Sequence, residues 1–251
     1  MITLKSPEDL ARMRVSGRLA GEVLDGLARA VSPGRTTQEL DDLARELIEA
    51  RGGRSAFFGY RGFPGQICVS INDEVVHGIP GPRRVQVGDI VSLDVGVVFD
   101  EFIGDTATTV MVGVSDPEIV RLVDTGRQAL EAAIAKAMPG GRLSDISHAI
   151  ESTARAAGYT VVRDFVGHGI GRSMHEDPQV PNFGPPGRGP KLKPGMTLAL
   201  EPMINRGGAE VEVMDDGWTV RTRDRGWSVH FEHTIAIGYG PAEILTCRPG
   251  R

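Results

Sequence analysis

The chain has 251 residues, of which 40% are hydrophobic and 24% are charged, and its formal net charge is −5. These values are typical of a globular protein and argue against nucleic acid as the main partner. No apolar run reaches the roughly 20 residues that a membrane span needs, and the first residues lack the apolar core of a signal peptide. Cys68 and Cys247 are too few for a disulfide framework or a thiolate metal site. We therefore expect a cytoplasmic protein with neither a membrane nor nucleic acid as partner.

Two helices are predicted in the first fifty residues. Pro7 is followed by two acidic residues, which is a helix-start signal, and apolar residues at i+4 spacing extend the pattern over residues 7–31. A second helix over residues 36–51 begins at a threonine cap and ends at Gly52-Gly53.

The second half of the chain repeats this plan. Pro33-Gly34 recurs 106 residues later as Pro139-Gly140, and a further helix is predicted directly before it, over residues 119–138. The run 88–94 is a glycine turn and an apolar strand with an acid as its seventh residue, and it recurs 107 residues later at 195–201. Such patterns also recur by chance, but the near-equal offsets favour a duplication.

The duplication predicts a fold class. We expect an α+β protein with helix–helix–strand halves, approximately residues 7–115 and 116–240, related by a pseudo-twofold axis around a mixed or antiparallel sheet. The acids that end the two repeated strands, Asp94 and Glu201, would then meet near that axis.

Asp94 lies in the middle of a strand-like run, Ile90 to Phe99, and the chain reverses soon afterwards. A two-residue turn at 99–100 would place Asp94 opposite Asp105 in an antiparallel hairpin, with Cβ atoms roughly 4.5–5.5 Å apart. Two carboxylates that close repel each other unless they share a proton or a cation. The pair is therefore predicted to form half of a two-metal site.

Three further stretches supply ligand-type side chains. His168 and His175 flank a glycine-rich segment in which Gly167, Gly169 and Gly171 disfavour a helix and let the backbone approach another group, a metal or a substrate. The long Pro/Gly segment 178–194 follows and is predicted to be a functional loop. Glu201 ends an apolar strand, and Glu232 shares one face of a strand over residues 229–237 with His230 and Thr234. Either glutamate alone is more simply explained as a solvated acid.

As a set, Asp94, Asp105, Glu201 and Glu232 with one imidazole from His168 or His175 carry the charge that two divalent cations would balance. Oxygen-rich ligation with one imidazole suits Mn, Fe, Co or Zn. Two such ions lower the pKa of a water molecule and polarise a carbonyl or phosphoryl oxygen, which makes hydrolysis the expected chemistry.

These residues resemble the methionine aminopeptidases, in their shorter type I bacterial form. The resemblance covers nearly the whole chain in order, and five spaced motifs carry it. They are Ser70–Pro80, Leu93–Asp94 through Gly104–Thr106, Gly167–Gly171 with His175–Pro178, Leu200–Pro202, and Phe231–Thr234. The resemblance implies the pita-bread fold, with an internal pseudo-twofold axis, and one catalytic domain over residues 1–251.

The resemblance also implies roles for individual residues. The five metal ligands would be Asp94, Asp105, His168, Glu201 and Glu232, with Asp105 and Glu232 bridging two divalent ions. His175 would hydrogen-bond the scissile carbonyl oxygen, His77 would contact the substrate near its leaving nitrogen, and Glu201 would also transfer the proton of the attacking water.

The methionine side chain needs an apolar pocket. Candidates for its lining are Phe57, Tyr60, Phe63, Cys68 and Trp218, of which Tyr60, Cys68 and Trp218 follow from the resemblance, whereas core packing explains Phe63 equally well. Phe57 departs from the family, because many bacterial relatives carry a small cysteine at this position.

The implied substrates are N-terminal peptides of nascent proteins, from which the initiator methionine is removed when a small second residue follows. The enzyme is expected to be monomeric. Transient ribosome association is expected too, though not through an N-terminal extension of the kind some type I members have, since the chain begins almost directly at its first helix.

Two other functions remain open from the sequence. A proline-directed aminopeptidase or prolidase would share the fold and the five ligands, but those chains usually carry an extra N-terminal domain. A non-catalytic binding module of the same fold would be expected to have lost metal ligands, and all five candidates are present here.

Overall fold

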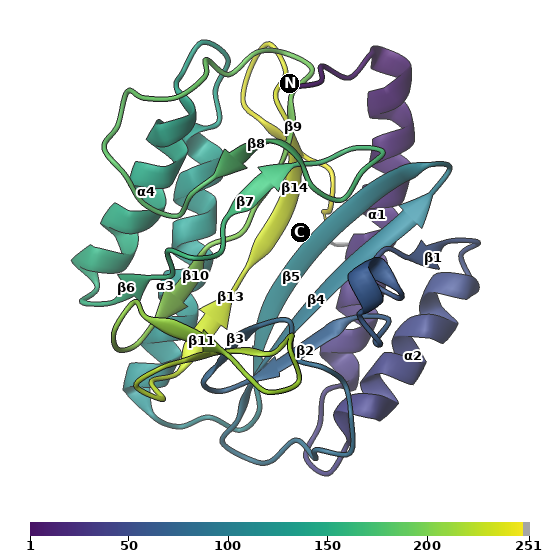
Figure 1. The fold of residues 1–251 in the computed structure, drawn as a ribbon, viewed down its shortest axis with the longest axis vertical. Helices are drawn as coiled ribbons and strands as arrows, with labels where there is room; N and C mark the ends of the chain where they lie inside the picture. Colours follow the sequence, from purple (N-terminus) through teal and green to yellow (C-terminus); the bar gives the residue numbers. More distant parts are fainter. Residues whose placement is uncertain (248–251) are drawn as a thin grey trace.

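The computed structural model describes residues 1–247 (Figure 1). Its helices are α1 (Pro7–Ala30), α2 (Thr37–Glu49), α3 (Pro117–Lys136), α4 (Leu143–Ala156) and the 3-10 turn η1 (Tyr60–Gly62). Its strands are β1 (Arg54–Ser55), β2 (Cys68–Ile71), β3 (Glu74–Val76), β4 (Ile90–Phe99), β5 (Phe102–Met111), β6 (Thr160–Val161), β7 (Gly167–Gly169), β8 (Glu176–Val180), β9 (Thr197–Leu200), β10 (Met203–Asn205), β11 (Val211–Val213), β12 (Val220–Thr222), β13 (Ser228–His230), β14 (Glu232–Ala236) and β15 (Glu243–Ile244).

The predicted helices are confirmed, with ends that differ by one or two residues. Ser6 caps α1 in a reciprocal capping box with Asp9, and Thr36 does the same for α2 with Glu39. Each pairing satisfies two backbone N–H groups at a helix start, which is why the sequence signals marked these starts closely. No helix in the described part of the chain is long and apolar enough to cross a membrane.

The hairpin of β4 and β5 has a register different from the predicted one. Gly96 pairs with Asp105 and Asp94 pairs with Ala107, so the two aspartates are diagonal neighbours rather than directly opposite. The turn is formed by Asp100 and Glu101, both with positive φ (49° and 68°), which is the backbone conformation that fits the right-handed twist of a two-residue hairpin. The shift is two residues, so both carboxylates still lie on the same face of the sheet.

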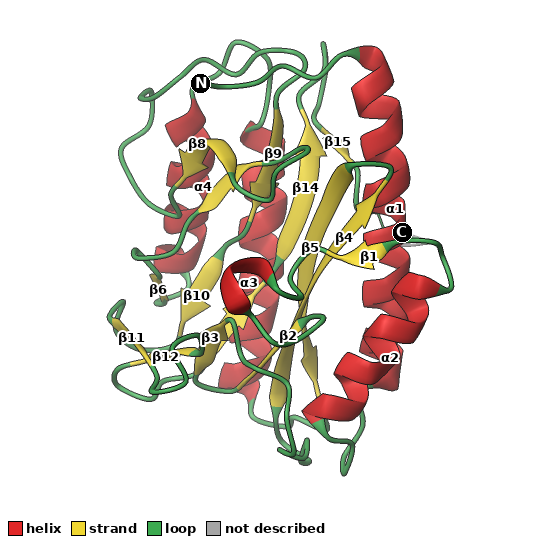
Figure 2. Cartoon of the chain, turned by 45° about the vertical axis from the view of Figure 1, so that its right-hand side comes forward, coloured by secondary structure: helices red, strands yellow, loops and turns green. Residues whose placement is uncertain are grey.

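One sheet of nine strands carries most of the fold, in the order β1-β4-β5-β14-β9-β7-β8, with β2 also paired to β4 and β15 to β14. The pairings between the described strands are antiparallel. Figures 1 and 2 show α1 and α2 beside the β4–β5 end of the sheet and α3 and α4 beside the other end. The α+β class and the duplicated helix pairs are therefore confirmed.

Each helix pair has its own hydrophobic core. One core joins α1 and α2 to β2 and β4, and the other joins α3 and α4 to β9 and β14. On β5, Gly104 faces α1 so closely that a Cβ atom would lie 2.5 Å from the Cα of Gly17. Because side chains alternate along a strand, the next residue, Asp105, points to the opposite face of the sheet.

The strand predicted over residues 229–237 is interrupted at Phe231. Its first part, β13, pairs with β10 in a separate three-stranded sheet, whereas β14 pairs with β5 and β9 in the large sheet. His230 and Glu232 therefore belong to different sheets. Both are buried, with 2% of each residue exposed, so this stretch is not a solvated face.

Candidate metal centre

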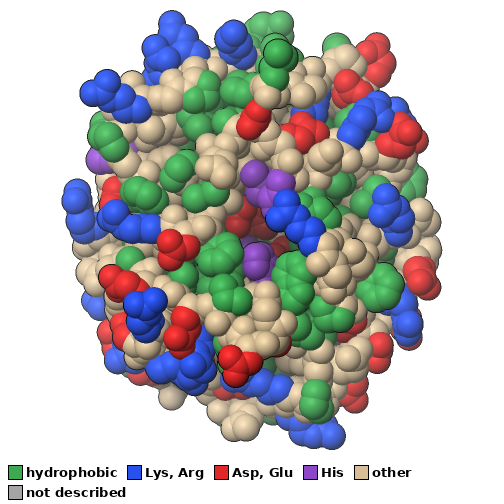
Figure 3. All heavy atoms as spheres, viewed as in Figure 1, with side chains coloured by type: hydrophobic (Ala, Val, Ile, Leu, Met, Phe, Trp, Pro, Cys, Tyr) green, Lys and Arg blue, Asp and Glu red, His purple; other side chains and the backbone are tan. Residues whose placement is uncertain are grey.

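The five predicted ligands come together on the face of the large sheet that α1 does not cover. Asp94 and Asp105 come from the β4–β5 hairpin, His168 from β7, Glu232 from β14, and Glu201 directly follows β9. They share a pocket of about 190 Å³ with the other predicted site residues. Figure 3 shows acidic and histidine side chains inside a hollow on this face.

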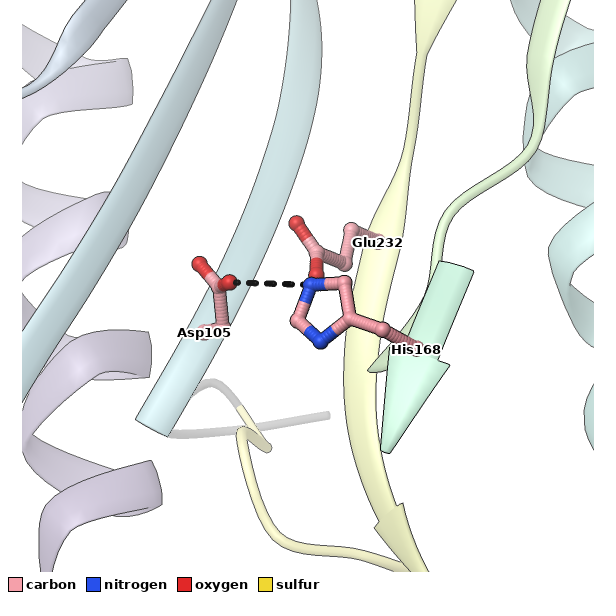
Figure 4. A group of neighbouring side chains, drawn as sticks. All are labelled: Asp105, His168 and Glu232. Atoms are coloured by element: carbon pink, nitrogen blue, oxygen red, sulfur yellow. Dashed lines mark ion pairs between the residues drawn. The ribbon is translucent and has the colours of Figure 1, made fainter. Parts of the chain in front are cut away.

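Asp105, His168 and Glu232 form the centre of the group. One ligand atom from each lies within 4.8 Å of the others, and Figure 4 shows the three side chains converging from three strands. The Nε2 atom of His168 is 3.9 Å from Asp105 Oδ2 and 3.6 Å from Glu201 Oε1. These spacings leave room for a cation between the side chains rather than a direct hydrogen bond.

The donor set fits divalent cations. Asp94 Oδ1, Asp105 Oδ1 and Glu232 Oε1 are buried oxygens without a hydrogen-bond partner. Burial raises the pKa of Asp105 to about 7, and burial together with the other carboxylates raises the pKa of Asp94, Glu201 and Glu232 well above the usual range. Buried and unpaired carboxylates are costly unless a cation compensates them, so this cluster favours metal binding.

His168 is oriented as a metal ligand would be. Its Nδ1 atom is 2.9 Å from the backbone oxygen of Gly169, which turns Nε2 toward the carboxylates. Burial, together with His175, lowers the pKa of His168 to about 4, so the ring is neutral at physiological pH. The neutral imidazole is the form that binds metal ions.

Two more histidines border the pocket. The hydroxyl of Tyr60 is 2.9 Å from Nδ1 of His175, whose ring centroid is 4.4 Å from that of His168. His77 has a positive φ of 60° and its ring makes edge contacts with Phe165 and Trp218. Burial lowers the pKa of His77 to about 4. Both rings are thus placed beside the ligand cluster but outside its centre.

The rest of the pocket is mostly apolar, with one guanidinium group in its lining. Its lining includes Phe57, Tyr60, Phe63, Cys68 and Trp218, as predicted, and two residues that the sequence analysis missed, Arg61 and Met174. Met174 directly precedes His175, and Arg61 directly follows Tyr60. Their positions next to predicted site residues were the only sequence feature that could have indicated them. His230 was also missed as part of the site: its Nε2 atom is 3.8 Å from Glu201 Oε2.

The glycines near His168 serve a different purpose from the predicted one. A Cβ atom at Gly167 would lie 2.4 Å from the backbone oxygen of Ala199, and one at Gly169 would lie 2.1 Å from that of Asp177. A Cβ atom at Gly171 would meet the side chain of Lys5. These glycines therefore allow close packing of neighbouring protein segments, not approach to a ligand.

The Pro/Gly segment 178–194 does not line the pocket. Its first residues belong to β8, and beyond them the backbone N–H groups of Gly187 and Arg188 donate to Asp145 and Ser144 at the start of α4. The link to the site is Asn182, whose Nδ2 donates to the backbone oxygen of Glu201 at 3.2 Å. The segment thus supports the position of Glu201 from behind.

Comparisons with known proteins agree with this geometry. Residues 11–238 match the model of metallopeptidase family M24. The chain is 48% identical over 246 residues to a methionine aminopeptidase of Clostridium perfringens and 46% identical to methionine aminopeptidase 1 of Bacillus subtilis, and in each case 98% of this chain and 99% of the relative are covered.

Solved structures give the same result. A methionine aminopeptidase from Thermotoga maritima superposes with a TM-score of 0.96 at 45% identity, covering 98% of this chain and 99% of that one. A prolidase from Pyrococcus furiosus superposes with a TM-score of 0.78 at 18% identity, covering 97% of this chain but only 65% of its own, which shows a shared fold alone. The pita-bread fold is thus confirmed. The chain belongs to metallopeptidase family M24, on its methionine aminopeptidase branch.

Proposed function

We propose that this protein removes the N-terminal methionine from nascent proteins and peptides by hydrolysis of the first peptide bond. The observation that carries the proposal is the juxtaposition of a buried carboxylate–imidazole cluster, with three unpartnered oxygens, and an apolar cavity in the same pocket. The cluster would hold two divalent ions (Co, Mn, Fe or Zn), and the cavity suits an unbranched side chain.

Asp94, Asp105, His168, Glu201 and Glu232 would hold the metal ions, with Asp105 and Glu232 shared between them. The unpartnered oxygens on Asp94, Asp105 and Glu232 support metal binding by this set, because each is available to a cation. When bound, the two cations would polarise the carbonyl oxygen of the first peptide bond and lower the pKa of the attacking water.

Protein side chains would supply the remaining steps. Glu201 would accept a proton from the attacking water and pass it to the leaving nitrogen, as a carboxylate beside the water can. His175 would donate a hydrogen bond to the carbonyl oxygen as negative charge develops on it. His77 would contact the substrate near the leaving nitrogen.

The methionine side chain would occupy the space between Phe57, Tyr60, Cys68 and Trp218, with Phe63 and Met174 behind them. Aromatic edges and sulfur atoms are favourable neighbours of a thioether. Cys68 is buried and burial raises the pKa of its thiol, so it acts there as a small apolar group.

The remaining parts of the proposal concern the cellular setting. The enzyme would act in the cytoplasm as a monomer, on chains with a small second residue, with transient ribosome association and without nucleic acid or a membrane as partner. The net charge of −5 supports the absence of a general affinity for nucleic acid.

Release of free methionine tests the proposal. Chelator-treated protein with Mn²⁺, Co²⁺ or Fe²⁺ added back is expected to cleave only after an initial methionine, in Met-Gly-Met-Met and in Met-Pro peptides, and to leave Ala-Pro peptides intact. Cleavage of Ala-Pro peptides instead would assign a proline-directed activity, and no cleavage with any metal would leave a binding module.

A further inference from the structure

His230 is a buried histidine that none of the proposed catalytic or metal-binding roles uses. Its Nε2 atom has no hydrogen-bond partner, although it lies 3.8 Å from Glu201 Oε2 and 4.0 Å from Glu232 Oε2. A polar side-chain atom that is fully buried and unpaired is costly, so its placement between two carboxylates calls for a function.

The two neighbours determine which proton His230 carries. With cations bound, Glu201 and Glu232 would be ionised and would only accept hydrogen bonds, and a lone pair on Nε2 would face their negative charge. Nε2 would therefore carry the proton.

The oxygens of Glu201 are shared between two imidazoles. Oε1 is 3.6 Å from Nε2 of His168 in the centre of the cluster, whereas Oε2 is the oxygen that faces His230. His230 would reach Oε2 with a hydrogen bond, either directly after a small rotation of the side chain or through one water molecule. This bond would fix the plane of the carboxylate and leave Oε1 directed toward the metal ions and the substrate.

The backbone of His230 is held firmly enough for this task. Its N–H donates to Oγ1 of Thr109 and its carbonyl oxygen accepts from the same hydroxyl, both at 3.0 Å. Since that hydroxyl proton is used, Ser92 Oγ, at 2.8 Å, donates to Thr109. The Ser92–Thr109 pair thus ties His230 to the β4–β5 hairpin that carries both aspartates.

We infer that His230 is a positioning residue, which orients the carboxylate of Glu201 through an Nε2–H hydrogen bond. This inference rests on the proposed metal centre and deepens it, because Glu201 would serve both as a ligand and as a proton carrier. Removing a hydrogen-bond partner behind a metal ligand typically reduces metal affinity or activity by about 10–100-fold.

Two substitutions separate hydrogen bonding from packing. His230→Gln keeps an N–H donor at a similar distance from the backbone, whereas His230→Leu fills similar space without a donor. His148→Leu on α4, remote from the pocket, controls for the loss of a histidine. Should His230→Leu fail to fold, His230→Met makes the same comparison.

The first measurement is Mn²⁺ binding to chelator-treated protein by calorimetry, and the second is kcat and KM for Met-Gly-Met-Met. We expect His230→Leu to weaken Mn²⁺ binding by about 10–100-fold and to lower kcat by a similar factor, with KM changed by less than about 3-fold. His230→Gln and His148→Leu should stay within about 3-fold of the parent protein in both measurements.

Parent-like binding and kcat in folded His230→Leu would overturn the inference. So would an equal loss in folded His230→Gln, because the imidazole itself would then be needed. If the parent protein releases no methionine while His230→Leu still weakens Mn²⁺ binding and His230→Gln does not, the proposed function fails and the role of His230 stands.

Discussion

The hydroxyl of Tyr60 lies 2.9 Å from Nδ1 of His175, across the mouth of the pocket. Partial burial and the nearby cation of Arg61 lower the pKa of His175, which keeps the ring neutral at pH 7. If Tyr60 donates to Nδ1, the single proton of the ring is on Nε2, where it is available to a substrate oxygen. The tyrosine would thus select the tautomer that the proposed oxyanion contact requires.

Replacing His175 with alanine should lower kcat by roughly 10²–10³-fold, as for the loss of one oxyanion donor. Metal binding should persist, because the side chain is not part of the proposed ligand set. Tyr60→Phe should have a smaller effect in the same direction, since it removes only the tautomer control. Kinetics and metal analysis of both variants check this, and loss of bound metal from His175→Ala would instead make His175 a ligand.

Asp105→Ala should abolish activity by removing the carboxylate proposed to join the two metal ions. The bound metal, measured after dialysis, should fall with it. Asp100→Asn is a matched control, because Asp100 sits at the exposed tip of the same hairpin and pairs with Arg12 instead. Full turnover with unchanged metal content in Asp105→Ala would contradict the assignment.

The contribution of Asp105 to the stability of chelator-treated protein should fall as pH rises from about 4 to about 7. Burial raises the pKa of Asp105 from the ordinary 3.8 to about 7, so the folded chain holds this proton over a range in which the unfolded chain has released it. When the folded state binds more protons than the unfolded state, the free energy of unfolding decreases as pH rises. Urea unfolding of the parent and of Asp105→Asn at several pH values should show this decline as a shrinking difference in stability, because the buried histidines, whose lowered pKa values act in the opposite direction, are present in both proteins.

Saturating Mn²⁺ should oppose that decline, since the cation replaces the proton as the partner of the carboxylate. Asp105→Asn should remove only the Asp105 part of the pH dependence in chelator-treated protein, because the amide does not titrate, whereas the carboxyl groups of Asp94, Glu201 and Glu232 still do. A stability difference between metal-free parent and metal-free Asp105→Asn that does not shrink from pH 5 to pH 7 would contradict the prediction.

Gly96→Ala should obstruct the methionine cavity. A Cβ atom at Gly96 would lie 2.7 Å from Cε1 of Phe57 and 3.0 Å from Cε of Met174, so the added methyl group pushes the pocket wall inward. We expect KM for Met-Gly-Met-Met to rise and the free energy of unfolding to fall by about 1–3 kcal/mol, the usual cost of overpacking.

Combining Gly96→Ala with Phe57→Leu should restore much of the affinity, because the smaller side chain yields space to the methyl group. Gly81→Ala is the control, since a Cβ atom there meets nothing within 4 Å. An unchanged KM in folded Gly96→Ala would place the methionine side chain elsewhere.

Local signals in the sequence predicted the elements well because their causes are local. Each capping residue pairs with a residue three positions later, Ser6 with Asp9 and Thr36 with Glu39, and both helix starts were predicted. The gathering of the five ligand candidates also followed, since each acid or histidine stands at a strand or strand end of a recognisable motif.

The register of the hairpin could not be predicted from the sequence, because two different registers keep both aspartates on the same face of the sheet. The choice between them depends on whether Asp100 and Glu101 adopt positive φ, and this pair lacks the glycine that usually marks such a turn. His230 and the glycines beside His168 were misjudged for another reason. Their roles depend on contacts with segments far along the chain, such as Thr109 and Ala199, which no local pattern reports.

The junction between β5 and β14 has a consequence for how the protein assembles. Thr234 Oγ1 accepts from the backbone N–H of Asp105 and donates to its carbonyl oxygen, while Thr106 Oγ1 donates to the carbonyl oxygen of Glu232. The ligand candidates lie on both sides of this junction, with a separate hydrophobic core behind each side and a third core, which includes Phe102 and Ala236, between them. Neither side holds a complete site, so metal affinity should appear only when the two sides dock. Bound metal would then slow the separation of the two sides more than it would reduce the flexibility of either side alone.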